Sequence, residues 1–143
     1  MGFDRFSEPG WWSILDRPRI ILIAHDSESV RTVIRKSIER ETSYQVCEAA
    51  DGLDAVRIGR ALKPDLAILD VGMPGLTGIE AATILRYSMP RIRIVLVSLH
   101  SDDLYQTLCN TLTSTIHIDA VISKSEGITG LIESVKNLLD QPD

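Results

Sequence analysis

Five short apolar runs alternate along this chain with longer segments in which apolar residues recur at helical spacing. Three of the runs, residues 19–24, 66–69 and 93–97, are rich in β-branched residues and nearly free of polar ones. Runs of this kind are typical of strands that are covered on both faces, as in a parallel sheet. Residues 44–49 and 120–122 are weaker runs, which we expect to form the outer strands of the same sheet.

Apolar residues at a helical period lie between these runs. The clearest stripes are Val30, Val33, Ile34 and Ile38 in one segment, and Ile128, Leu131, Ile132, Val135 and Leu139 in the last one. Asp51 and Ser101 are suited to cap the N-termini of two further helices. A thinner stripe of Leu104, Leu108 and Leu112 follows Ser101. Strands and helices that alternate through short connections predict an α/β fold, a doubly wound parallel sheet with helices on both faces.

Composition and charge restrict the function classes. The 143 residues suffice for one domain with a real core, and the net charge is −5. The sequence contains no block of Lys and Arg for a nucleic-acid surface, no apolar run near the roughly 20 residues of a membrane span, and no secretory signal. Cys47 and Cys109 lack metal-binding spacing and are expected to be reduced, buried thiols. We therefore expect a cytoplasmic domain that contacts neither nucleic acid nor membrane.

The first 18 residues differ from the rest, and we expect them to form an N-terminal extension to a domain that spans residues 19–143. The extension contains both Phe and both Trp residues of the chain. It is interpreted either as a tail or extra turn packed on the domain, or as a docking segment, since Trp and Phe are frequent interface anchors. The sequence leaves both interpretations open.

Polar side chains are expected to converge where the predicted strands end. In an open α/β sheet, ligands bind just beyond the carboxyl ends of the strands. The residues that the strands bring to that edge are, in chain order, His25, Asp26, Asp70, Ser98, His100 and Lys124. Each of them alone has an ordinary explanation as a cap, a turn residue or a solvated charge. Their arrival from four separate strands predicts a functional site.

The pair of Asp26 and Asp70 indicates the chemistry of that site. Two carboxylates at one edge repel each other unless one is protonated or a cation lies between them. Oxygen ligands favour Mg²⁺, and the backbone at Gly72 could turn a carbonyl oxygen toward the ion. A carboxylate can also act as a nucleophile and form an aspartyl phosphate. That reaction requires positioning, a divalent ion and a cation for the transferred oxygens, which Asp70, Mg²⁺ on Asp26 and Lys124 would supply.

Four segments carry a resemblance to a known family. ILIAHD (21–26), ILDVGMPGLTG (68–78), LVSLH (96–100) and AVISKSEG (120–127) each span the end of a predicted strand. Together they resemble the receiver domain of response regulators, over about residues 19–139. The resemblance implies a five-stranded parallel sheet in the flavodoxin-like order 2-1-3-4-5. It also implies a signalling module of a two-component phosphorelay, which catalyses only its own phosphotransfer and dephosphorylation and is not otherwise an enzyme.

The same resemblance assigns roles to the site residues. Asp70 would accept a phosphoryl group from a histidine kinase or a phosphotransfer protein. The resemblance implies that Asp26, Asp70 and the Gly72 carbonyl bind Mg²⁺, and that His25 contacts these ligands rather than the ion. It also implies that Ser98 and Lys124 bind the phosphoryl oxygens. Output would pass to a protein partner that the sequence does not name. The family often forms homodimers through the face of its fourth helix, which makes such a dimer an expectation here.

Departures from the family pattern keep alternatives open. His25 stands where the family has an acidic residue, so that Mg²⁺ binding is expected to be weaker or lost. One alternative is a phosphorylation-independent pseudo-receiver that acts as a protein-interaction module. Another is a transition-metal or pH-sensing site made by His25, Asp70 and His100. Val121 occupies the usual position of a switch aromatic, which predicts a modest structural change on phosphorylation. A phosphatase is disfavoured because Gly72 lies where a second acid would be needed.

Overall fold

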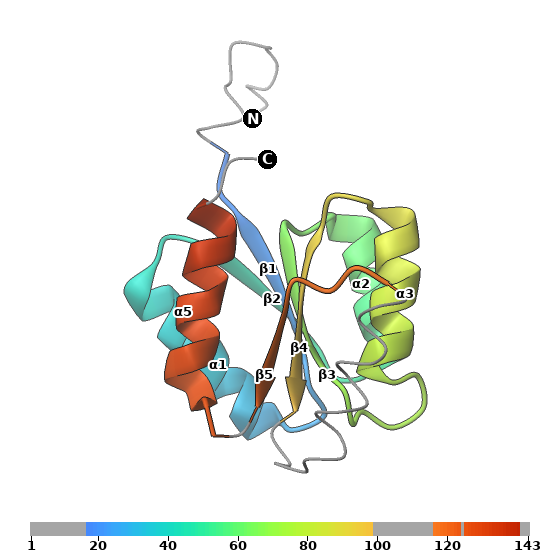
Figure 1. Ribbon diagram of the computed structural model, residues 1–143, viewed down its shortest axis with the longest axis horizontal. Coiled ribbons are helices and arrows are strands. Elements are labelled where there is room, and N and C mark those ends of the chain that lie inside the picture. Colours follow the sequence, from blue (N-terminus) through green and yellow to red (C-terminus); the bar gives the residue numbers. More distant parts are fainter. Residues whose placement is uncertain (1–16, 99–115, 124, 141–143) are drawn as a thin grey trace.

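The computed structural model describes residues 17–98, 116–123 and 125–140, in which strands and helices alternate as far as β4 (Figure 1). In chain order the elements are β1 (Ile20–Ala24), α1 (Glu28–Glu41), β2 (Gln45–Ala49), α2 (Gly52–Leu62), β3 (Leu66–Asp70), α3 (Gly78–Ser88), β4 (Arg93–Ser98), β5 (Ala120–Ser123) and α5 (Gly127–Asp140). All five predicted strands are present, and each differs from its predicted bounds by one residue at one end. Within the described residues, no helix combines the length and apolar character that crossing a bilayer requires.

The five strands form one sheet in the order β2-β1-β3-β4-β5, and all four pairings are parallel. Figure 1 shows α1 and α5 on one face of this sheet and α2 and α3 on the other. The predicted fold class is confirmed, and so is the strand order that the resemblance implied. Because the strands are parallel, their carboxyl ends lie at one edge, where the candidate site residues follow them.

The core consists of two clusters, one on each face of the sheet, because successive residues of a strand face opposite sides. The α2–α3 cluster contains Leu22 of β1 and Leu85 of α3 among its buried residues. The α1–α5 cluster contains Ile23 of β1 and Ile132 of α5. Full burial of such a side chain contributes about 1.5–3 kcal/mol of transfer free energy. Both clusters therefore hold the central strands in place, from opposite sides.

Side chains that precede the helices fix where α2 and α3 begin. Asp51 is the N-cap of α2, as predicted, and its carboxylate accepts a hydrogen bond from the Asp54 backbone N–H at 2.8 Å. Thr77 and Glu80 form a capping box at the start of α3, in which each side chain accepts from the other residue's backbone N–H. These caps fix the first turns of both helices, which begin shortly after the ends of β2 and β3.

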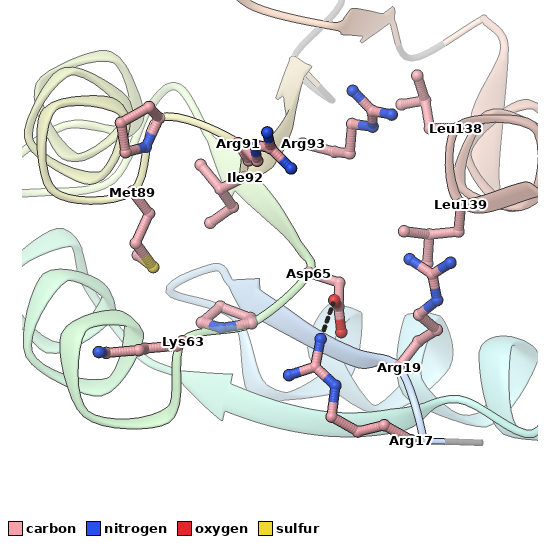
Figure 2. Close-up of a pocket in the computed structure, with 12 residues that line it drawn as sticks. Arg17, Arg19, Lys63, Asp65, Met89, Arg91, Ile92, Arg93, Leu138 and Leu139 are labelled. Carbon is pink, nitrogen blue, oxygen red and sulfur yellow. Dashed lines mark hydrogen bonds and ion pairs between the residues drawn. The ribbon is translucent and has the colours of Figure 1, made fainter. Parts of the chain in front are cut away.

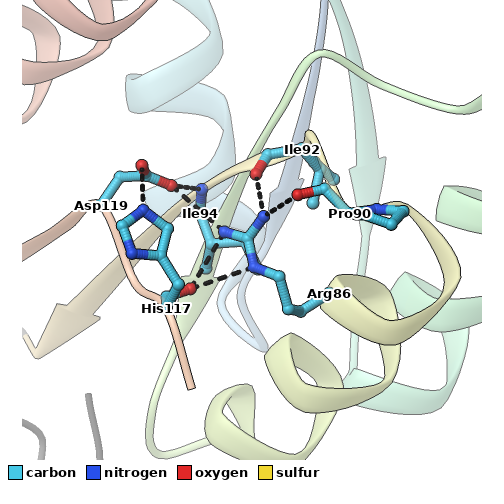
Figure 3. A network of polar contacts seen from close by, with 6 residues as sticks. All are labelled: Arg86, Pro90, Ile92, Ile94, His117 and Asp119. Atoms are coloured by element: carbon cyan, nitrogen blue, oxygen red, sulfur yellow. Dashed lines mark hydrogen bonds and ion pairs between the residues drawn. The ribbon is translucent and has the colours of Figure 1, made fainter. Parts of the chain in front are cut away.

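The opposite edge of the sheet is held together by Arg86, near the end of α3 (Figure 3). Its guanidinium donates to the backbone carbonyl oxygens of Pro90 and Ile92 at 2.8 and 2.7 Å, and to that of His117 at 3.0 Å. It also pairs with the Asp119 carboxylate at 3.3 Å. One side chain thus joins α3 to the segments that lead into β4 and β5.

Cys47 is a free thiol, as predicted, but it is half-buried rather than buried, because β2 is an outer strand. Burial raises the pKa of this thiol above its ordinary value of 9.0. Other expectations fall outside the described residues. They concern most of the N-terminal extension, Cys109, His100, Lys124, and the helix expected from Ser101 onward.

Candidate functional site

The candidate residues lie at the carboxyl edge of the sheet because the strand register brings the strand ends level with one another. Ala24 at the end of β1 is opposite Leu69 of β3, and Asp70 is opposite Val97 of β4. Ser98 at the end of β4 is opposite Ser123 of β5. His25 and Asp26 therefore follow β1 beside the strand end that carries Asp70.

Asp70 is the last residue of β3 and is only 1% exposed. The backbone around it is fixed on two sides. Val71 donates from its N–H to the Val97 carbonyl oxygen at 3.0 Å. Gly78 begins α3 so close to Asp70 that a Cβ atom on the glycine would lie 2.2 Å from the Asp70 carbonyl oxygen. An ionised carboxylate buried to this degree requires positive charge or hydrogen-bond donors nearby, which makes Asp70 the centre of the candidate site.

His25 lies between the two carboxylates. Its Nε2 atom is 3.6 Å from Oδ2 of Asp70, and its Nδ1 atom is 3.3 Å from Oδ1 of Asp26. The histidine is buried, at 6% exposure, whereas the Asp26 side chain is half exposed. The backbone N–H of Ser27 donates to Nδ1 at 3.0 Å, so that the nitrogen accepting this bond carries no proton. The proton of the neutral ring is then on Nε2, on the side of Asp70.

Arg31 of α1 holds the backbone of His25 in place, and sequence reasoning missed this residue. Its guanidinium donates to the His25 carbonyl oxygen at 2.7 Å and pairs with Glu48 of β2 at 3.0 Å. The His25 backbone N–H donates to the Ala49 carbonyl oxygen at 3.2 Å. Arg35, one helical turn after Arg31, pairs with the same Glu48 at 2.8 Å. The spacing of four residues places Arg31 and Arg35 on one face of α1, which the sequence shows. Their acidic partner Glu48 lies on β2, and the sequence does not show that pairing.

A metal ion could be held at this edge by the three side chains that the structure brings together. Ligand atoms of His25, Asp26 and Asp70 all lie within 4.8 Å of one another. The two carboxylates are suited to a hard divalent cation such as Mg²⁺, which prefers oxygen ligands. The imidazole between them does not belong to that preferred set, because nitrogen ligands suit transition metals better. The residues present thus fit a divalent cation. The two carboxylates suit Mg²⁺, whereas the imidazole suits a transition metal better.

The structure describes some of the remaining residues that were predicted from the sequence. Ser98 is buried, at 2% exposure, one residue beyond the β4 position that pairs with Asp70. Gly72 is exposed in the turn after β3. Val121 of β5 is half-buried and packs against the α2–α3 cluster. The structure therefore brings Ser98 to the same edge as Asp70, whereas Lys124 and His100 are among the residues that it does not describe.

A cavity of about 440 Å³ lies at the opposite, amino-terminal edge of the sheet (Figure 2). Basic side chains line it around one acidic residue, Asp65; they are Arg17, Arg19, Lys63, Arg91 and Arg93. Asp65 accepts from the Ile20 backbone N–H at 2.8 Å and pairs with Arg17 at 3.5 Å. Asp65 thus fixes the start of β1 beside the start of β3. This cavity is separate from the carboxylates of the candidate site.

Comparison with known proteins identifies similar chains. A family model described as the response regulator receiver domain matches residues 21–136. The response regulator GacA of Pseudomonas aeruginosa is 38% identical over 88 residues, which are 61% of this chain and 41% of that protein. The response regulator VraR of Staphylococcus epidermidis is 28% identical over 119 residues, 81% of this chain and 54% of that protein. The chain thus spans between two fifths and just over half of the length of these two curated relatives.

Solved structures show the same arrangement of strands and helices. The response regulator TrrA of Thermotoga maritima, in complex with Mg²⁺ and BeF, has a TM-score of 0.72 at 27% identity, covering 84% of this chain and 98% of that one. A LuxR-family two-component response regulator of an Aurantimonas species has a TM-score of 0.74 at 27% identity, covering 86% of each chain. The fold of this chain thus occurs in solved structures of response regulators.

Proposed function

Because the chain belongs to the response regulator receiver domain family, we propose that it is a phosphoacceptor of a two-component phosphorelay, with Asp70 as the phosphorylated residue. Receiver domains are signalling modules of two-component systems. The observation that carries the proposal is the position of Asp70, a buried carboxylate at the end of β3 with Asp26 and His25 beside it. Ser98 reaches the same edge from the neighbouring strand.

The reaction that this arrangement supports is a phosphoryl transfer. A carboxylate oxygen of Asp70 forms the new bond to phosphorus, and the bond between phosphorus and the donor breaks, with its electron pair leaving on the donor. The donor would be a phosphohistidine of a histidine kinase or of a phosphotransfer protein. Ser98 and Lys124 would hold the phosphoryl oxygens. Burial of Asp70 and Ser98 keeps both groups in fixed positions before the donor arrives.

A divalent cation would assist this transfer. Asp26, Asp70 and the Gly72 carbonyl are the proposed ligands, and His25 lies among them. When bound, the cation would neutralise charge that develops on the phosphoryl oxygens. Support for Mg²⁺ comes from TrrA of Thermotoga maritima, whose solved structure is a complex with Mg²⁺ and BeF. The two carboxylates of this chain are oxygen donors of the kind that Mg²⁺ prefers.

Output would pass through protein contacts in the cytoplasm, without nucleic-acid or membrane binding by this chain. The acidic net charge of −5 supports that proposal. Residues 19–143 would form the receiver and residues 1–18 an extension of it. The downstream partner would be a protein whose identity the sequence does not indicate. A homodimer through the fourth-helix face would present a surface made by both copies to that partner.

Intact-protein mass spectrometry after incubation with acetyl phosphate tests this proposal. We expect one phosphoryl adduct on the wild-type protein in the presence of Mg²⁺ or Mn²⁺, its loss on addition of EDTA, and no adduct on Asp70→Asn. Asp140→Asn, at the exposed end of α5, is the matched control and should retain the adduct. If folded wild-type protein gives no adduct with either ion, the phosphoacceptor proposal is wrong and a phosphorylation-independent interaction module replaces it.

A further inference from the structure

We propose that His25 makes the Asp26–Asp70 site selective for a transition-metal ion, such as Mn²⁺, Co²⁺ or Zn²⁺, over Mg²⁺. The inference rests on the proposed function only in that it concerns the same site. It starts from the position of the ring, which has one nitrogen 3.6 Å from the Asp70 carboxylate and the other 3.3 Å from the Asp26 carboxylate. A cation that contacts both carboxylates therefore also meets the imidazole.

The ring cannot easily make room for such a cation. His25 is 6% exposed. Its backbone is held from two elements, by the hydrogen bond to the Ala49 carbonyl oxygen and by the guanidinium of Arg31. Arg31 is itself paired with Glu48 of β2. The imidazole thus stays beside the carboxylates unless its side chain leaves a buried position, which costs free energy.

The two kinds of ion respond differently to a fixed imidazole. Mg²⁺ requires near-ideal octahedral oxygen coordination and keeps several of its waters, for which the ring leaves less space. First-row transition metals accept imidazole nitrogen readily, and their affinity for mixed nitrogen and oxygen sites rises from Mn²⁺ toward Cu²⁺. One imidazole with two carboxylates is a donor set of that mixed type. The same residue that weakens the site for Mg²⁺ therefore strengthens it for these ions.

Ser27 provides a local reporter for ligation by His25. Its backbone N–H donates to Nδ1 of the ring at 3.0 Å. A metal ion on Nδ1 would take the lone pair that accepts this bond. A metal ion on Nε2 would force the ring proton onto Nδ1, which could then no longer accept. Ligation through either nitrogen thus breaks the Ser27 hydrogen bond, whereas Mg²⁺ held only by oxygen atoms leaves it intact.

The experiment measures ion affinity by calorimetry and the Ser27 amide resonance by NMR, using the full chain with Mg²⁺, Mn²⁺ and diamagnetic Zn²⁺. In the wild type we expect Zn²⁺ to shift the Ser27 resonance more than Mg²⁺ does, because only Zn²⁺ breaks the hydrogen bond from Ser27 to the ring. His25→Asp should tighten Mg²⁺ binding and reduce the preference for Mn²⁺ over Mg²⁺ by at least about tenfold. His117→Asn removes an exposed histidine far from the site and should leave the preference as it is. Asp70→Asn should weaken binding of all three ions.

Two results would overturn the inference. One is an equal preference between ions in the wild type and in His25→Asp. The other is a Ser27 resonance that saturating Zn²⁺ shifts no further than saturating Mg²⁺ does. The acetyl phosphate assay separates this failure from that of the proposed function. A transition-metal preference without any phosphoryl adduct upholds the inference and rejects the phosphoacceptor role. If the phosphoryl adduct forms but His25→Asp has the same preference between ions as the wild type, the phosphoacceptor role is upheld and the inference is rejected.

Discussion

Gly78 approaches Asp70 so closely that α3 could not begin where it does with any other residue at that position. A Cβ atom on Gly78 would lie 2.2 Å from the Asp70 carbonyl oxygen and 2.7 Å from its carbonyl carbon. Both are backbone atoms at the end of a buried strand, so they cannot move aside as a flexible side chain would. The position of the Asp70 backbone and the start of α3 therefore constrain each other.

Gly78→Ala should accordingly destabilise the protein, although alanine is the better helix former. We expect a loss of about 1–3 kcal/mol in the free energy of unfolding, the usual range for overpacking a filled site. Urea denaturation monitored by circular dichroism measures it. Thr83→Ala, on the exposed face of the same helix, is the control and should change stability by less than about 0.5 kcal/mol. Equal stability of Gly78→Ala and wild type would contradict the close approach.

Arg31→Met should disturb His25 without touching its side chain. The substitution removes the hydrogen bond to the His25 carbonyl oxygen and the pairing with Glu48. Hydrogen bonds of charged groups contribute about 1.5–3 kcal/mol, and Arg35 still neutralises Glu48, so we expect the lower end of that range. Shifts of the His25 ring resonances should accompany the loss. Arg40→Met removes an exposed arginine of the same helix, and a comparable effect there would argue against a specific role of Arg31.

Arg86→Lys should be costly even though it preserves the charge. A lysine ammonium cannot reach the carbonyl oxygens of Pro90, Ile92 and His117 and the Asp119 carboxylate together. We expect a loss of about 2–4 kcal/mol, since the Asp119 side chain is only 8% exposed. Arg60→Lys, whose arginine donates to one serine hydroxyl at 3.3 Å, is the matched control for chevron or equilibrium unfolding measurements. Little difference between the two variants would disprove the anchoring role.

Cys47 should be alkylated slowly, with a rate that rises only at high pH. Burial raises the pKa of its thiol above 9.0, and the thiolate is the reactive form. Iodoacetamide labelling of Cys109→Ser from pH 7 to pH 10 should give a midpoint above that of the urea-unfolded chain. A group with a raised folded-state pKa also destabilises the fold as pH rises past its unfolded value. Stability should therefore decline above about pH 9 more in this variant than in Cys47→Ala/Cys109→Ser.

The features that could be predicted from the sequence are those that depend on nearby residues, such as strands and helix caps. Buried parallel strands appear as continuous apolar runs, which is why β1, β3 and β4 could be placed to within a residue. The outer strands β2 and β5 are less buried and have weaker patterns, but their positions were also predicted to within a residue. The N-cap role of Asp51 was equally readable, because a cap acts within its own helix. The carboxyl edge with Asp26, Asp70 and Ser98 followed from the rule that parallel strands end at one edge.

Long-range partners could not be predicted from pattern. Asp65 and Asp119 look like ordinary loop residues, yet each places a carboxylate oxygen 2.8 Å from a backbone N–H of a neighbouring strand, that of Ile20 and that of Ile94. Their roles depend on residues 45 and 25 positions away. The approach of Gly78 to Asp70 and the support of His25 by Arg31 likewise appear only once the elements are packed.

The division of the core by the sheet has a consequence for how this sequence can be altered. Leu85 and Ile132 belong to clusters on opposite faces that share strands but contain no residue in common. Substitutions such as Leu85→Ala and Ile132→Ala should therefore add in their effects within about 0.5 kcal/mol. A chimera could take α2, α3 and the strand residues that face them from a relative. It would then contain the whole α2–α3 cluster of that relative, and the α1–α5 cluster would be unchanged. Recombination can thus exchange half of this interior at a time.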